Sequence, residues 1–163
     1  MTVILPMMVV AMKTSSFQNV FLALAFAGAC TAMTSNLDMN KDDNLTGTWT
    51  CVSATVDGKE LPRETAALLR LTLTQDRYKT EKGPDVLFDS SYRVDTSQTP
   101  RHISMIGTEG DLKGKEAQGI YSIDKDVLRI CYTMPGDNRP EKFESTPGSK
   151  AYLVIWKREH KTI

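Results

Sequence analysis

The chain has 163 residues with twenty basic and twenty acidic side chains, so its formal net charge at pH 7 is zero. This balance gives no electrostatic basis for binding nucleic acid or an anionic membrane surface, and the length suits a single domain. Hydrophobic residues make up 40% of the chain and charged residues 25%, which is typical of a folded protein rather than a disordered one.

Residues 1–29 have the pattern of an export signal peptide. Met12-Lys13 begins a short basic segment, an apolar run follows over residues 20–27, and Ala27-Gly28-Ala29 satisfies the small-x-small rule for signal peptidase. The apolar run is shorter than the ~20 residues that span a bilayer as a helix. Residues 1–11 precede the first lysine, so we expect translation to start at Met12.

Cys30 directly follows this cleavage motif. Ala27-Gly28-Ala29-Cys30 resembles a bacterial lipobox, in which the cysteine is diacylated and becomes the new N-terminus, although Ala27 stands where leucine is commonest. Residues 30–44 are polar and lack periodicity, which favours a flexible tether. Two acyl chains would hold the protein at a membrane, so we expect a lipoprotein of the cell envelope. Ordinary cleavage before Cys30, giving a secreted protein, is the alternative.

The first elements after the tether are extended. Residues 46–56 are rich in β-branched residues and contain Trp49, and Asp57-Gly58 marks the turn that ends this strand. Pro62 and Glu64 then have the positions expected for the start of a short helix.

The rest of the chain contains strands at short, regular spacing. The clearest is the run from Leu69 to Thr74, in which leucines alternate with polar residues. Further strands are predicted at residues 77–82, 86–95, 101–107, 116–123, 126–133, 141–144 and 151–157. About eight strands and one short helix predict a single all-β sandwich or closed barrel over residues 45–158, followed by a polar tail at 159–163.

Seven motifs along this domain occur in a fixed order. They are Leu45-x-Gly47-Thr48-Trp49, Asp57-Gly58-Lys59, Asp95 ahead of Thr99-Pro100, Lys113-Gly114-Lys115, Gly119-Ile120-Tyr121, Leu128-x-x-Cys131 and Arg139-Pro140. Together they resemble a lipocalin-like domain family of planctomycetes and related bacteria, which often follows a lipoprotein signal. The resemblance implies a small antiparallel β-barrel exposed to the cell envelope, and it implies no activity.

A looser similarity to true lipocalins concerns barrel closure and rests on Gly47-x-Trp49 and Arg158. In that fold the tryptophan closes the base of the barrel and an arginine lies over its ring, as a cation–π contact. Two alternatives remain open: Trp156 could fill the same space, or Trp49 could be an ordinary large core residue.

Two further cysteines, Cys51 and Cys131, remain if Cys30 is acylated. An even pair in an oxidising compartment allows a disulfide between an early and a late strand. The alternative is a pair of buried thiols that behave as small hydrophobic residues.

No catalytic or metal-binding set is evident. The two histidines, His102 and His160, lack the neighbouring ligands that a zinc site needs, and the chain has no nucleophile elbow or glycine-rich phosphate loop. Arg139-Pro140 with Glu141 could form a carboxylate-binding corner or simply a rigid, exposed turn. We therefore predict no enzyme, no metal site and no cofactor.

The remaining hypothesis is a monomeric binding module, because alternate residues of each strand line the interior of a small barrel. The candidates to line a cavity for a small apolar ligand are Leu69, Leu71, Leu73, Phe88, Ile103, Met105, Tyr121, Leu128, Ile130 and Tyr132. If these side chains fill the core, the alternative is a structural envelope lipoprotein that binds another protein through loops 108–115 and 135–140. A weaker third hypothesis is an enzyme that places His102 beside a carboxylate.

Overall fold

The computed structural model of the protein describes residues 42–160. The predicted signal peptide, Met12, Cys30 and most of the tether therefore lie outside the described residues. The elements are the 3₁₀ helices η1 (Asp43–Leu45) and η2 (Gly110–Leu112), the helix α1 (Arg63–Ala66), and the strands β1 (Gly47–Val56), β2 (Lys59–Glu60), β3 (Leu69–Leu73), β4 (Arg77–Lys82), β5 (Asp85–Asp95), β6 (Arg101–Gly107), β7 (Glu116–Asp124), β8 (Val127–Thr133) and β9 (Ala151–Arg158).

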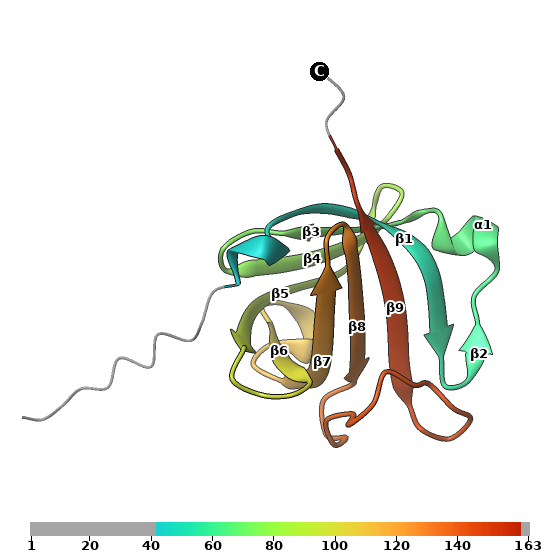
Figure 1. Ribbon diagram of the computed structural model, residues 1–163. Helices are drawn as coiled ribbons and strands as arrows, with labels where there is room; N and C mark the ends of the chain where they lie inside the picture. The colour runs from blue at the N-terminus through green and yellow to red at the C-terminus, as the bar shows by residue number, and fades with distance from the viewer. Residues whose placement is uncertain (1–41, 161–163) are drawn as a thin grey trace, which may run out of the picture. The chain divides into compact units, whose positions relative to one another are not determined.

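These strands form a closed antiparallel β-barrel (Figure 1). Each strand from β3 to β8 pairs with the next along the chain, β1 pairs with β3, and β1 also pairs with β9. The two-residue β2 pairs with the end of β1 and stays outside the ring, so eight strands close the barrel. The structure confirms the predicted lipocalin-like, all-β architecture with one short helix after the first strand.

The predicted strand at residues 141–144 is wrong. These residues contain bends between β8 and β9 and form no ladder in the described structure. The physical reason is that β8 pairs with β9 along its whole length, from Val127↔Lys157 to Thr133↔Ala151. No edge is then left at which an intervening strand could pair.

The closing pair of strands brings Trp49 and Arg158 together at one end of the barrel, here called the base. The two are Cα partners across β1 and β9, and the Arg158 guanidinium carbon lies 4.0 Å from the centroid of the Trp49 ring. Arg158 donates a hydrogen bond of 2.7 Å to the Thr46 carbonyl and another to the Asn44 carbonyl. Gly47, at φ +142°, leaves room for this guanidinium, because a Cβ there would lie 2.8 Å from Arg158 Nη1.

The segment before β1 covers this base. The indole N–H of Trp49 donates to the Leu45 carbonyl at 3.0 Å, and Leu45 is fully buried. Asp42, which caps η1, forms an ion pair of 2.8 Å with Arg101 and accepts a hydrogen bond of 3.1 Å from the Tyr121 hydroxyl. Asp42 and Leu45 therefore add contacts at the base just before β1 begins.

The segment after β8 lies against the outer wall, anchored by Arg139. Its guanidinium donates 2.8 Å to the Ile103 carbonyl and 3.0 Å to the Ser104 hydroxyl, and it also donates to the Gly119 carbonyl. The Arg139 guanidinium is therefore bound to the barrel wall, whereas the neighbouring Asn138 and Glu141 are exposed. A basic side chain next to a proline indicated exposure, but carbonyls of β6 and β7 provide its acceptors.

The two cysteines of the barrel are free thiols. Cys51 packs in the interior core, whereas Cys131 packs in a separate outer cluster that includes Phe143. The disulfide considered from the sequence is not formed, because β9 runs between β1 and β8. Strands are about 4.8 Å apart, so the two Cα atoms are separated by roughly 9 Å or more, beyond the ~7 Å that a disulfide can bridge. Burial raises the pKa of the Cys51 thiol to about 11 and also raises the pKa of Cys131.

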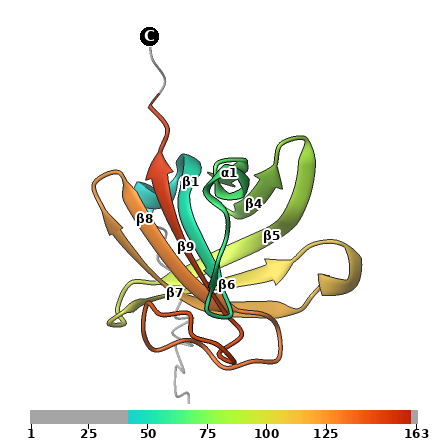
Figure 2. The same cartoon turned by 90° about the vertical axis from the view of Figure 1, so that its right-hand side faces the viewer.

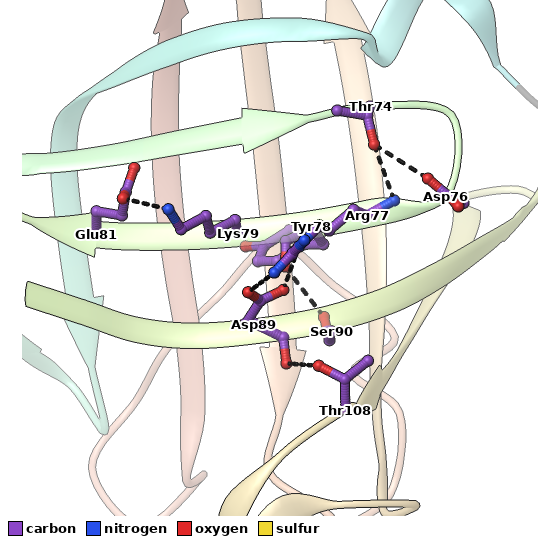
Figure 3. A network of polar contacts seen from close by, with 9 residues as sticks. All are labelled: Thr74, Asp76, Arg77, Tyr78, Lys79, Glu81, Asp89, Ser90 and Thr108. Carbon is purple, nitrogen blue, oxygen red and sulfur yellow. Dashed lines mark hydrogen bonds and ion pairs between the residues drawn. The ribbon is translucent and has the colours of Figure 1, made fainter.

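An ion pair joins β4 to β5 on the outer wall (Figure 3). Arg77 Nε donates to Asp89 Oδ1 at 2.7 Å, and a second guanidinium nitrogen contacts Oδ2. Thr108, beyond β6, donates to the Asp89 carbonyl at 3.0 Å, so the same residue connects three segments. The hydrogen bonds from Arg77 hold the pKa of the Asp89 carboxyl below its ordinary value of 3.8.

This pKa shift predicts how stability depends on pH. A carboxyl whose pKa is lower in the folded state stabilises the fold above its unfolded pKa, and this contribution is lost as the pH falls through the folded pKa. We expect Asp89→Asn to lower the urea midpoint at pH 7 and to have no effect in acid well below pH 3.8. Asp111→Asn, which removes an exposed carboxylate with no ion pair among residues 42–160, is the control. A pH-independent loss in Asp89→Asn would contradict the assignment.

No helix within residues 42–160 is long and apolar enough to cross a membrane.

Candidate ligand cavity

The end of the barrel opposite the base, here called the mouth, holds a cavity of about 450 Å³ that opens to solvent. Leu61, just before α1, and Thr65, within α1, line this cavity. Leu112 and Met134, from the connections after β6 and β8, also line it. Figure 2 views the barrel from this end, with α1 in front. The volume lies within the ~300–1,000 Å³ that ligand pockets occupy.

The ten residues proposed to line a cavity divide into two groups. Leu69, Phe88 and Tyr132 line the cavity at the mouth. The other seven do not line it but pack in the core: Leu71, Leu73, Ile103, Met105, Tyr121, Leu128 and Ile130, each 0 or 1% exposed. Three of the ten residues therefore border this hollow, and the other seven lie in the packed interior.

Side-chain size explains the difference between the two halves. At the base, the indole of Trp49 enters the interior together with leucines and isoleucines, and the space is full. Nearer the mouth, the inward positions include Ala54, Ala117 and Val154, which line the cavity. Small side chains at these three positions leave the hollow.

Aromatic rings make up much of the cavity wall. Tyr78 meets Phe88 edge to face with centroids 6.2 Å apart, and Tyr132 stacks on Tyr152 at 4.9 Å and 13°. Burial raises the pKa of Tyr78 and Tyr132 above the ordinary value of 10, so both phenols stay neutral at physiological pH. Trp156 also lines the cavity, and its buried indole N–H has no hydrogen-bond partner among residues 42–160.

Several of these wall residues were missed from the sequence. Tyr78 lies in a strand, Arg77 to Lys82, whose mixed polar composition hides its inward face. Trp156 and Tyr152 lie on the last strand, where both faces carry large apolar residues, so alternation could not decide between them. The signal that could have found Tyr78 is alternation with Thr80 and Lys82, which also line the cavity.

A second hollow, of about 340 Å³, lies on the outer wall over β5, β6 and β7 and is polar. It brings His102 beside Asp95, its Cα partner on the neighbouring strand. Burial and the nearby Arg139 lower the pKa of His102, and Asp95 opposes that shift. His102 therefore lies beside a carboxylate, as the enzyme hypothesis requires. However, the hydroxyl of Ser104, which could act as a nucleophile, bonds to Arg139 and to Glu116 rather than to the imidazole.

Within the described part of the chain, no three His, Cys, Asp or Glu side chains lie together in a group that could hold a metal ion. The polar side-chain groups that line the cavity are threonine and tyrosine hydroxyls, the indole N–H of Trp156 and one ammonium, that of Lys82.

No protein-family model, curated protein or solved structure matches this chain. The fold assignment therefore rests on the strand pairing, and the functional assignment rests on the cavity.

Proposed function

We propose that the protein is an exported, lipid-anchored member of the lipocalin-like family that binds a small apolar ligand in its barrel. The observation that supports binding is the solvent-open cavity of about 450 Å³ with aromatic and aliphatic walls. The alternative, a structural envelope protein with a filled core, is less well supported because only the base half of the interior is packed.

The proposed anchor is Cys30, through the lipobox-like motif that ends there. Eleven residues lie between it and Asp42, the first residue of the described barrel. A chain of that length spans at most about 40 Å when extended. The anchored barrel would therefore act close to the membrane surface, where apolar ligands concentrate.

The size of the cavity sets the expected affinity. A ligand that buries on the order of 300 Å² of apolar surface gains about 7 kcal/mol at roughly 25 cal/mol per Å². Association costs some of this free energy, and displaced water and aromatic contacts offset part of the cost. We therefore expect dissociation constants of about one micromolar or larger, which corresponds to weaker binding.

The proposal is tested with N-phenyl-1-naphthylamine, an uncharged fluorophore whose emission rises in apolar surroundings. We expect saturable enhancement at one fluorophore per chain, because the described barrel has one apolar cavity at its mouth. The enhancement should disappear when urea unfolds the protein. Enhancement that never saturates, or that survives unfolding, would show adsorption to apolar surface and would remove the proposed function.

A further inference from the structure

We infer that the ligand is a single-chain amphipathic anion, whose charged head lies at Lys82 in the mouth while its apolar chain enters the barrel. This inference rests on the proposed function and adds the chemical class of the ligand to it. The argument begins with the inward-facing residues of one strand, β4.

Polarity increases along the inner face of β4 from the floor of the cavity to its rim. Tyr78 is 2% exposed, Thr80 is half-buried and Lys82 is exposed, and all three line the cavity. Lys79 and Glu81 pair with each other on the opposite face of the strand (Figure 3). Alternation thus places the ammonium of Lys82 on the cavity side of the rim.

Lys82 is the single charged residue among those that line the cavity in the described structure. Its Cα partner across the hairpin is Asp85, yet no ion pair joins the two, and Lys82 has no other ion-pair partner among residues 42–160. The cavity therefore presents one uncompensated positive charge, and that charge lies at its entrance.

This arrangement selects both the charge and the orientation of a ligand. An anionic head at the rim can approach Lys82 while it keeps part of its water, so it avoids the large desolvation cost of a buried charge. The apolar chain then lies against Phe88, Leu69 and Val154 deeper in the barrel. A ligand in the reverse orientation would bury its charge among aromatic rings and leave its apolar chain in water.

The test compares dodecanoate with dodecanol as competitors of bound N-phenyl-1-naphthylamine, at about pH 8, where the carboxylate is ionised. The two competitors share the same chain, so the ratio of their displacement constants isolates the head group. In the unmodified protein, we expect Lys82 to favour dodecanoate over dodecanol. Lys82→Gln should reduce this preference roughly three- to fivefold. Lys82→Glu should reduce it roughly tenfold or more, because it adds repulsion. Salt should weaken the preference by screening.

The matched control is Lys157→Glu, which makes the same charge change at an exposed position on β9, toward the base. We expect it to leave the ratio unchanged. If the fluorophore binds but the ratio is the same in the unmodified protein and both Lys82 variants, the inference about the anionic head fails and the proposed function stands. If the fluorophore does not bind to the folded, unmodified protein, the proposed function itself fails.

Discussion

Replacing Trp49 with alanine is expected to lower the free energy of unfolding by about 3–5 kcal/mol, the usual cost of truncating a large buried aromatic residue. The ring is fully buried, its N–H donates to the Leu45 carbonyl, and Arg158 covers one face. The substitution therefore removes core packing and leaves a guanidinium without its aromatic partner. Urea unfolding followed by circular dichroism would measure the change.

The control on the same strand is Val52→Ala, because Val52 is 53% exposed. We expect it to change the unfolding free energy by less than about 0.5 kcal/mol. Arg158→Met and the double variant complete a thermodynamic cycle, in which the coupling between Trp49 and Arg158 should be about 1–2 kcal/mol. A loss below about 1 kcal/mol in Trp49→Ala would contradict the assignment of this residue to the closed base.

Replacing Ala117 with phenylalanine is expected to abolish most ligand binding while the barrel stays folded. Ala117 is buried, lines the cavity and lies on β7 close to Tyr132 of the wall. A phenyl ring placed there would occupy space that the ligand needs. If it displaces on the order of 100 Å² of ligand contact, the affinity falls by about 2.5 kcal/mol, or roughly 70-fold. Fluorophore titration measures this change.

The matched control adds the same ring to the outside of the barrel at Ser91, which is exposed on β5. Ser91→Phe should bind the fluorophore as the unmodified protein does. Thermal unfolding of Ala117→Phe should show at most a small loss of stability, because the ring enters an existing hollow rather than a packed core. Full binding by a folded Ala117→Phe protein would show that the ligand site lies elsewhere.

The strands were predictable wherever one segment carried its own signal. Leu69, Leu71 and Leu73 alternate with polar residues, and all three face the interior. Turn signals such as Asp57-Gly58 also occur where β1 ends. These features depend on residues adjacent in the chain, so local physics is enough to predict them.

The errors occurred where a distant segment provides the partner. Residues 141–144 were predicted to form a strand, yet β8 and β9 are already paired, so no edge remains for them. Arg139 has the sequence context of an exposed residue, but carbonyls of Ile103 and Gly119 accept its hydrogen bonds. Neither acceptor could be identified from the neighbours of Arg139 in the chain.

The sequence by itself determined that residues 45–158 form short strands around one core, with Trp49 and Arg158 at positions compatible with barrel closure. Only the tertiary structure decided that Trp156 faces inward and that the interior is packed at the base and hollow at the mouth. The physical reason is that the free volume at each level of a barrel depends on the inward side chains of all eight strands together. Those side chains meet only when β1 pairs with β9.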